Sequence, residues 1–409
     1  MPGLGALRGG PALPILIGAS VMLSLAMGLR QSLGLFMAPA VKDLAITVAD
    51  FTLAIAVQNL AWGFLQPIAG ALAGRIGFRP VLVGGVVAYL GGLAVLATAD
   101  GILGVMLGAG VLIGLALACC ASSMAMAVVS RPVPAVVRST VLGLVSAAGS
   151  LGALVSAPIG QVLADGFGWR VGVLGFLALG LAMLPAAWAA GRVDRVPVPA
   201  TRGEAGSAME AFRVAVRHPP FVIMTGAYFI CGLQLVFLTT HLPSYLTLCG
   251  MDPMLGATAL AVIGGCNILG SLFFGWAGGR WSKPALLGGI YLARSLVLGW
   301  YFAVPPTPGS TVVFAALMGF LWLGVAPLTS GMVAEMFGLR WQAMILGFAF
   351  TSHQLGSFLG AYGGGLVFDA TGSYELAWKL GVGMGLVAGT VQILAAVPRW
   401  PGPRVAATG

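Results

Sequence analysis

The sequence predicts an all-α polytopic membrane protein with twelve transmembrane helices in two pseudo-symmetric six-helix bundles. Of its 409 residues, 59% are hydrophobic and only 8% are charged, and the mean hydropathy is +1.01. A soluble domain carries charges on roughly a quarter of its residues, so the lipid bilayer is the expected solvent. The 63 glycines suit closely packed membrane helices better than a barrel of alternating strands.

Twelve apolar stretches follow one another along the chain, each long enough to cross a hydrocarbon core of about 30 Å. The first stretch is too long for a signal-peptide core of roughly 7–15 residues, so we expect a retained helix there. The predicted helices lie near residues 14–39, 51–73, 80–98, 102–128, 136–163, 170–189, 221–248, 254–278, 285–304, 311–336, 341–368 and 376–397.

One polar interval, rich in Arg and Pro, is much longer than the others and covers residues 190–220. It divides the predicted helices into six and six. We therefore expect an N-terminal six-helix bundle over residues 1–190, a cytoplasmic linker over residues 191–220, and a C-terminal six-helix bundle over residues 221–409.

Basic residues are concentrated on one side of the predicted helices. That side carries Arg8, Arg75, Arg79, Arg131, Arg138, Arg192, Arg195, Arg202, Arg213, Arg217, Arg280, Lys283, Arg340, Arg399 and Arg404. The loops of the other side carry only Lys42, Arg170 and Lys379, together with the acids Asp43, Asp50, Asp100, Asp165, Asp252, Asp369 and Glu375. The positive-inside rule places the basic side in the cytoplasm, so both termini are expected there.

The two halves repeat each other at a nearly fixed offset. The segment from Gly70 to Arg75 recurs 205 residues later, from Gly275 to Arg280. Further matches at an offset of 204 residues are Leu142-Gly143, Leu151-Gly152, Gly160 and Asp165 with Leu346-Gly347, Leu355-Gly356, Gly364 and Asp369. Two parallel repeats around an axis normal to the membrane place a central site between halves that can rock against each other. We therefore expect a secondary transporter that moves a small solute by alternating access.

No pattern in the chain indicates catalysis. A Walker loop, a zinc-type histidine–glutamate pattern and a nucleophile elbow are missing from the sequence. We expect no enzyme activity, no catalytic residue, no cofactor, no metal and no nucleic-acid partner. The five cysteines have neither disulfide nor metal-ligand spacing. The expected partners are a small-molecule substrate and the lipid bilayer, and the expected state is a monomer.

In its repeated segments the chain resembles the major facilitator superfamily, and the resemblance extends over its whole length. Gly70 to Pro80 is similar to the signature loop between helices 2 and 3, and Gly275 to Pro284 is similar to its copy between helices 8 and 9. The run from Gly149 to Gly160 is similar to a glycine–proline signature of helix 5 in some exchangers. In place of the usual acid of the loop, this chain has Gly74, and Gly279 in the copy. The resemblance implies gating or conformational roles for Gly70, Arg75, Gly77, Arg79, Gly275, Arg280 and Pro158.

Three further stretches resemble bacterial relatives of the monocarboxylate porters and the oxalate–formate exchangers. They run from Arg30 to Phe36, from His353 to Gly360 and from Phe368 to Tyr374. The resemblance implies a bacterial inner membrane and a carboxylate substrate. Those transporters use a basic residue on helix 8 to meet the carboxylate, whereas this chain has Asn267 in the middle of helix 8.

Away from the first and last turns of the predicted helices, only two basic residues occur, Arg30 and Arg294. An intramembrane arginine costs about 2.5–3.5 kcal/mol on insertion scales, so it faces a cavity, a partner or a substrate. No acid lies at similar depth to pair with Arg30, and its guanidinium could bind a substrate carboxylate or bond to carbonyls and polar side chains. Arg294 lies on helix 9, which the resemblance implies is peripheral, with Tyr291 on the same face. It is better explained by bonds to backbone carbonyls.

A few other polar side chains lie inside the predicted helices. His353 and His241 could carry protons if transport is proton-coupled, because imidazole titrates in the physiological range, or they could be hydrogen-bonded packing residues. The Asn and Gln side chains inside the helices could contact the substrate or form hydrogen bonds between helices. The predicted substrate-binding residues are Arg30, Asn59, His241, Asn267, His353 and Gln354.

Two transport functions fit these residues best, and transport of another solute, such as a sugar or a peptide, is a third alternative. The first is import or exchange of a small organic anion, a monocarboxylate or dicarboxylate, by a symporter or antiporter of the inner membrane. It depends on Arg30 and on the subfamily resemblance. The second is efflux of apolar or amphipathic compounds, which the glycine pattern of helix 5 allows, although proton-driven efflux of cations normally uses a buried carboxylate that this chain lacks.

Overall fold

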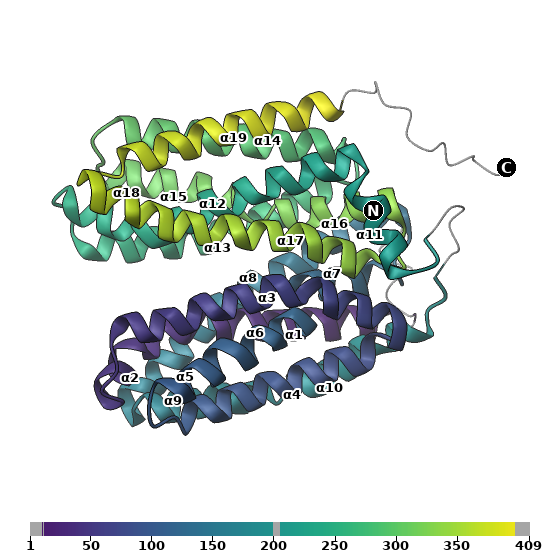
Figure 1. The fold of residues 1–409 in the computed structure, drawn as a ribbon, viewed down its shortest axis with the longest axis horizontal. Helices are drawn as coiled ribbons and strands as arrows, with labels where there is room; N and C mark the ends of the chain where they lie inside the picture. Colours follow the sequence, from purple (N-terminus) through teal and green to yellow (C-terminus); the bar gives the residue numbers. More distant parts are fainter. Residues whose placement is uncertain (1–9, 11, 199–204, 397–409) are drawn as a thin grey trace.

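The computed structural model describes residue 10, residues 12–198 and residues 205–396. These residues form two helical bundles that lie side by side (Figure 1). The segment between the bundles contains one short helix, α11 (Ala208–Val216). No strand occurs in the described part of the chain. The predicted fold class, with twelve helices in two bundles, is confirmed.

In the described part of the N-terminal bundle the chain crosses the fold six times, and several crossings combine segments of different helical pitch. Their elements in chain order are α1 (Ala12–Ser32), η2 (Leu33–Phe36), α2 (Met37–Asp43), α3 (Val48–Ile76), α4 (Phe78–Ala97), α5 (Ile102–Val105), η3 (Met106–Leu112), α6 (Ile113–Cys120), α7 (Ser122–Ser130), α8 (Ala135–Phe167), α9 (Trp169–Gly180), α10 (Met183–Ala190) and η4 (Gly191–Arg195).

The C-terminal bundle repeats this arrangement with six crossings in its described part. Its elements are α12 (Pro219–Leu248), α13 (Pro253–Ala277), α14 (Lys283–Ala303), α15 (Pro308–Trp322), α16 (Val325–Phe337), α17 (Gln342–Phe358), η5 (Leu359–Gly363), α18 (Gly364–Thr371) and α19 (Glu375–Ala396).

Most helices extend past their predicted ends, and this corrects the placement of five acids. Expected in loops, they lie instead in the end turns of helices: Asp43, Asp50, Asp165, Asp369 and Glu375. Asp50 shows the reason, because it forms a capping box with Thr47 that starts α3 a turn before the apolar stretch. The predicted helix end at residue 397 and Arg8, Arg202, Arg399 and Arg404 lie outside the described residues.

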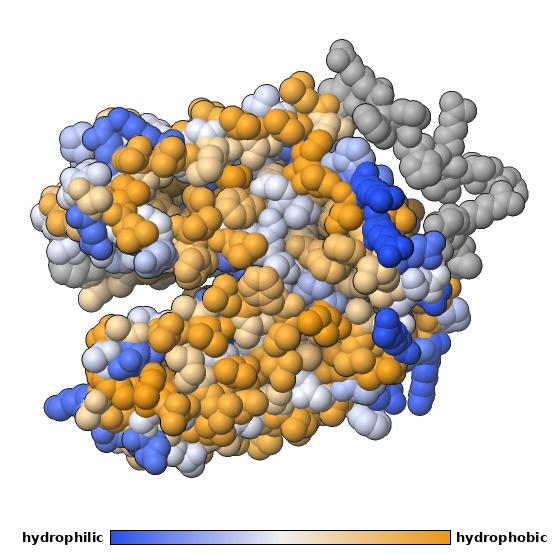
Figure 2. Space-filling model, viewed as in Figure 1, coloured by the Kyte–Doolittle hydropathy of each residue, from blue (hydrophilic) through white to orange (hydrophobic). Residues whose placement is uncertain are grey.

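Eleven of the described helical runs are long and apolar enough to cross a membrane. The remaining run, from α17 to α18, has four polar residues from Thr351 to Gln354 in its middle. It contacts α3 and α12, so polar groups at this depth have protein partners. On the face shown in Figure 2, apolar residues cover the sides of both bundles, and hydrophilic residues gather at their ends.

The bundles are in contact from the middle of the molecule to the end at which α11 lies, which we call the linker end (Figure 1). A Cβ atom on Gly275 would lie 2.5 Å from the Cα atom of Gly143, and one on Gly70 would lie 2.4 Å from the backbone nitrogen of Met344. Only hydrogen fits at such distances. The helix pairs α8–α13 and α3–α17 therefore cross in backbone contact, as small residues allow in membranes.

Polar contacts between the bundles lie in the same half of the molecule or at its middle. Gln342 Nε2 donates to Ser130 Oγ at 3.1 Å, and Thr351 Oγ1 donates to the carbonyl of Gly63 at 2.7 Å. At the opposite end, which we call the open end, the bundles diverge, and Figure 2 shows the cleft between them. The cleft therefore opens at one end of the molecule and is closed at the other.

Candidate functional site

Arg30 lies past the middle of the first span, in the last turn of α1. Its Nε donates to Gln58 Oε1 at 3.1 Å, and its Nη2 donates to Asn59 Oδ1. The guanidinium carbon lies 5.1 Å from the centre of the Trp62 ring. These three partners all belong to α3, so one helix holds the guanidinium by two neutral amides and an aromatic face.

The two amides are themselves held by backbone carbonyls. Gln58 Nε2 donates to the carbonyl of Ala109 at 2.6 Å, and Asn59 Nδ2 donates to the carbonyl of Ile55 at 3.0 Å. Ala109 belongs to η3, a π-helical segment, and such segments often occur at functional sites. With their NH₂ groups engaged, both amides direct an oxygen toward Arg30.

The guanidinium of Arg30 keeps donors to spare. Of its five N–H groups, the two hydrogen bonds above use one on Nε and one on Nη2. Nη1 has no hydrogen bond to a described residue. It is also not among the buried side-chain nitrogens that lack a partner, so it remains accessible. In the described part of the chain the ion pairs are Arg170–Asp43, Lys283–Glu335 and Lys379–Glu375, and none includes Arg30. A cation with neutral partners and spare donors is suited to bind a carboxylate.

Gln354 of α17 joins this group to the C-terminal bundle. Its Nε2 donates to the carbonyl of Asn59 at 3.0 Å and lies 3.4 Å from Asn59 Oδ1. The adjacent His353 has Nδ1 3.3 Å from Gln354 Oε1. We call Arg30, Asn59, His353 and Gln354 the central cluster. These four of the six predicted substrate-binding residues lie together, two from each bundle.

Aromatic rings pack around the C-terminal half of the central cluster. The His353 ring stacks on Phe350, with a centroid distance of 5.6 Å, and lies 4.7 Å from the Tyr228 ring. Phe350 also packs on Trp62 at 4.6 Å. The Trp62 ring next to Arg30 and the Phe350 ring next to His353 are therefore in direct contact, so the cluster packs on one continuous aromatic surface.

The other two predicted substrate-binding residues, His241 and Asn267, form their hydrogen bonds with residues outside the central cluster. His241 Nε2 is 2.9 Å from the carbonyl of Ala361 in the π-helical segment η5. Asn267 donates to Ser150 Oγ at 3.1 Å and accepts from the Leu323 amide at 2.9 Å. These bonds tie α12 to η5, and α13 to α8 and to the break between α15 and α16.

Arg294 makes the carbonyl bonds expected of it. It is fully buried on α14, and its Nη2 donates to the carbonyls of Leu321 and Trp322 at 2.8 and 3.2 Å. These carbonyls end α15, where they lack helical partners. Nη1 donates to Cys231 Sγ at 3.2 Å, and the guanidinium lies 5.7 Å from the Tyr291 ring.

Five of the predicted conformational residues occupy different places in the fold. Gly70 and Gly275 lie in the backbone contacts between the bundles. Gly77 has φ +94° and forms the turn between α3 and α4. Arg75 is exposed in the last turn of α3, and Pro158 lies inside α8.

The remaining two, Arg79 and Arg280, stack on tryptophans of their own bundle. The guanidinium of Arg79 lies 4.5 Å from the Trp188 ring, and that of Arg280 lies 4.3 Å from the Trp276 ring. Neither forms a hydrogen bond or ion pair across the bundle interface with another described residue.

Sequence reasoning missed two residues that pack on the turn from Gly74 to Arg79, in which Gly74 replaces the usual acid. The ring of Trp341, from the opposite bundle, lies 2.7 Å from where a Cβ on Gly74 would be. Asp194 accepts from the amides of Phe78 and Arg79 at 2.7 and 2.9 Å and so caps α4. Asp194 stands between arginines in a polar segment, and nothing in the sequence distinguished it from a solvated charge.

Gln342 was also missed, although a polar residue at the start of an apolar stretch was an available signal. Its side chain is fully buried, and its Nε2 lies within hydrogen-bond distance of Ser130 Oγ, Ser330 Oγ and the Ser330 carbonyl, at 3.1, 3.0 and 3.1 Å. It therefore connects α17 to α7 and α16 at the linker end.

Comparisons with known proteins agree with this architecture. Residues 18–361 match the family described as the Major Facilitator Superfamily. Monocarboxylate transporter 13 of Rattus norvegicus is 27% identical over 392 residues, which cover 93% of this chain and 88% of that protein. The uncharacterized MFS-type transporter YcxA of Bacillus subtilis is 29% identical over 163 residues, covering 36% of this chain and 37% of that protein.

Solved structures share the fold at low sequence identity. The Escherichia coli fucose:proton symporter FucP aligns with a TM-score of 0.70 and 16% identity, covering 93% of this chain and 98% of that chain. The proton:xylose symporter XylE aligns with a TM-score of 0.68 and 12% identity, covering 93% of this chain and 94% of that chain.

Proposed function

The chain belongs to the Major Facilitator Superfamily and is a membrane transporter, and we propose that it transports small organic anions, monocarboxylates or dicarboxylates, by rocker-switch alternating access. The observation that carries this proposal is the guanidinium of Arg30, which has neutral amide partners, spare N–H donors and no ion-pair partner among the described residues. A carboxylate would supply the missing negative charge.

The linker end of the molecule is, in this proposal, the cytoplasmic end. Among the basic residues there are Arg79, Arg138, Arg192, Arg195 and Arg280, and an excess of Lys and Arg marks the cytoplasmic side. The cleft then opens to the outside of a bacterial inner membrane, and the contacts around Gly70 and Gly275 form the closed inner gate. Opening that gate while closing the outer end would move a bound solute inward.

The substrate would bind between the bundles at the central cluster. Arg30 would hold the carboxylate with Nη1 and the second N–H of Nη2, while Trp62 and Phe350 would contact the carbon chain. The hydrogen bond from Gln354 to Asn59 joins the two bundles next to this site. A ligand that draws Arg30 away from Asn59 would therefore act directly on a contact between the moving halves.

The similarity to monocarboxylate transporter 13 supports the anion over other cargoes. Efflux of cationic compounds fits less well, because no Asp or Glu of the described residues accompanies Arg30 in the middle of the bundles. Efflux of neutral amphipathic compounds is the alternative that the experiment below distinguishes.

We propose His353 as the group that couples transport to protons. It is half-buried, whereas His241 is almost fully buried and bonded to a carbonyl. Its Nδ1 lies beside Gln354, so a change in its charge would be felt by the amide that links it to Asn59 and Arg30.

The test is uptake by the purified full chain in proteoliposomes. Radiolabelled lactate, pyruvate and malonate are compared with lactamide, the uncharged analogue of lactate. We expect counterflow of at least one carboxylate and none of lactamide. Equal uptake of lactamide, or extrusion of a neutral dye without any carboxylate counterflow, would refute the anion proposal.

A further inference from the structure

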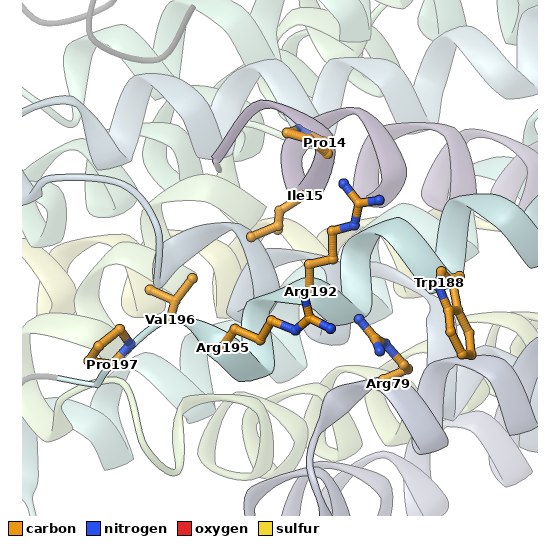
Figure 3. Close-up of a pocket in the computed structure, with 8 residues that line it drawn as sticks. All are labelled: Pro14, Ile15, Arg79, Trp188, Arg192, Arg195, Val196 and Pro197. Carbon is orange, nitrogen blue, oxygen red and sulfur yellow. The ribbon is translucent and has the colours of Figure 1, made fainter. Parts of the chain in front are cut away.

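A separate cavity lies at the linker end of the N-terminal bundle, where α1, α4, α10 and η4 meet (Figure 3). Its volume is about 470 Å³, within the range of ligand pockets. None of its lining residues belongs to the central cluster. The cavity is therefore a feature that anion transport through the cleft does not explain.

Three arginines line this cavity: Arg79 of α4, and Arg192 and Arg195 of η4. In Figure 3 the guanidinium groups of Arg79 and Arg195 point toward each other. None of the three takes part in an ion pair with another described residue. Because like charges repel, an anion placed between these groups would stabilise the arrangement.

Among the described residues, the acid beside these arginines is Asp194, and its carboxylate is already hydrogen-bonded. Both carboxylate oxygens of Asp194 accept hydrogen bonds from the amides of Phe78 and Arg79, at 2.7 and 2.9 Å, where they cap α4. This acid therefore serves the helix end, and it makes no hydrogen bond or ion pair with the three guanidinium groups.

Arg79 stacks on an aromatic ring and has an unpartnered N–H group. Its guanidinium lies 4.5 Å from the Trp188 ring, which fixes the plane of the group, and its Nε is buried with no hydrogen-bond partner. A buried N–H group without a partner is unfavourable. A phosphate oxygen would satisfy it, and arginine binds phosphate through two parallel N–H donors.

The rest of the wall is apolar. It includes Ile15, Val196 and Pro197. Trp188, with 56% of its surface exposed, is a side chain typical of the membrane–water interface. Such a wall can accommodate a glycerol group and the first methylenes of acyl chains, which a small soluble phosphate lacks.

We propose that this cavity binds the phosphate headgroup of an anionic phospholipid from the cytoplasmic leaflet, with Arg79, Arg192 and Arg195 around the phosphate. Anionic lipids are typical of that leaflet, and basic pockets between helices on that side bind their headgroups. The proposal depends on the orientation given above and not on the identity of the transported solute.

The test measures binding of short-chain phosphatidylglycerol to the detergent-purified full chain by native mass spectrometry. Phosphatidylcholine with the same acyl chains is the headgroup control, and inorganic phosphate is the soluble competitor. The variant Arg192→Gln/Arg195→Gln is compared with Arg213→Gln/Arg217→Gln, which removes the same charge from exposed positions at the linker end outside the cavity.

We expect phosphatidylglycerol to bind more tightly than phosphatidylcholine and to resist millimolar phosphate. Its affinity should fall about fivefold for each arginine removed, and so about 25-fold in the cavity variant, with little change in the control variant. Equal loss in both variants, no loss in the cavity variant, or equal binding of the two lipids would overturn the proposal. Displacement by phosphate at equal concentration would overturn the lipid as the ligand and assign a soluble phosphate compound. Two of these measurements use the unmodified chain and do not depend on how the variants fold: phosphatidylglycerol against phosphatidylcholine, and competition by phosphate.

Discussion

Replacing Arg30 by Gln removes the positive charge of the central cluster while keeping a hydrogen-bonding side chain of moderate length. In the structure, Nε and Nη2 of Arg30 bond to Gln58 and Asn59, and Nη1 remains available. The substitution therefore deletes the group that would meet a carboxylate and leaves Trp62 in place.

The size of the effect follows from the hydrogen bonds that are lost. A hydrogen bond to a charged group contributes about 1.5–3 kcal/mol, and a carboxylate fork on Arg30 would contain two of them. Since the glutamine amide can restore part of this, we expect a loss of about 3 kcal/mol, or about a 100-fold weaker Kd for the carboxylate. Arg30→Lys retains the charge without the fork and should lose about tenfold.

The assay is counterflow of a radiolabelled carboxylate in proteoliposomes, together with equilibrium binding of the same compound to the detergent-purified protein. Size-exclusion chromatography and the apparent Tm identify variants that have lost their fold. Arg170→Gln is the matched control, because it removes an equal charge from the open end, where Arg170 pairs with Asp43 at 3.1 Å.

Unchanged carboxylate binding in folded Arg30→Gln would refute the reasoning, because the central cluster contains no other arginine and no lysine. An equal loss in Arg170→Gln would also refute it, since attraction by the net charge of the surface would then be sufficient.

Three further predictions concern the packing, the gate and the coupling. Arg294→Met should lower the apparent Tm, because it leaves the carbonyls at the end of α15 without partners, at about 1–3 kcal/mol, while carboxylate Kd in the folded fraction stays the same; an unchanged Tm would contradict this role. Gly275→Leu should separate α13 from α8 and populate a form that is open at the linker end, measured by spin-label distances, because its Cβ would lie 2.5 Å from Gly143. Gly289→Leu, where no atom lies within 4 Å of the added Cβ, should leave those distances unchanged, and equal distances in both variants would exclude this gate. His353→Gln should make uptake insensitive to an imposed proton gradient, because a glutamine side chain cannot carry a proton, and a response identical to that of the unmodified chain would exclude His353 as the coupling group.

The closed linker end combines two kinds of contact with different consequences. Glycine contacts such as Gly143–Gly275 allow close approach but contribute no directional bond. The hydrogen bond from Gln342 to Ser130 is directional and buried. Opening the gate would break this hydrogen bond. Gln342, which sequence reasoning missed, is therefore expected to influence how often the gate opens.

The central cluster was only partly accessible to sequence reasoning. Arg30 stood out because an intramembrane arginine is costly, and Asn59, His353 and Gln354 because polar residues are rare in apolar stretches. Their mutual contacts depend on the rotation of α3 and α17 about their axes, which the nearly uniform apolar character of these helices does not define. For the same reason the sequence did not reveal that His241 and Asn267 form their hydrogen bonds with residues outside the cluster.

The fold class followed from the sequence because burial in lipid imposes one rule on every span: apolar length with internally bonded backbone. That rule can be checked in each stretch of the sequence separately. The internal repeat and the unequal distribution of basic residues can likewise be recognised without knowing the fold. Which side chains meet was decided only in three dimensions, by backbone contact at glycines and by carbonyls of π-helical segments such as that of Ala109. The pairing of Asp194 with the start of α4 joins residues more than a hundred positions apart, and distant contacts of this kind leave no periodic signal along the chain.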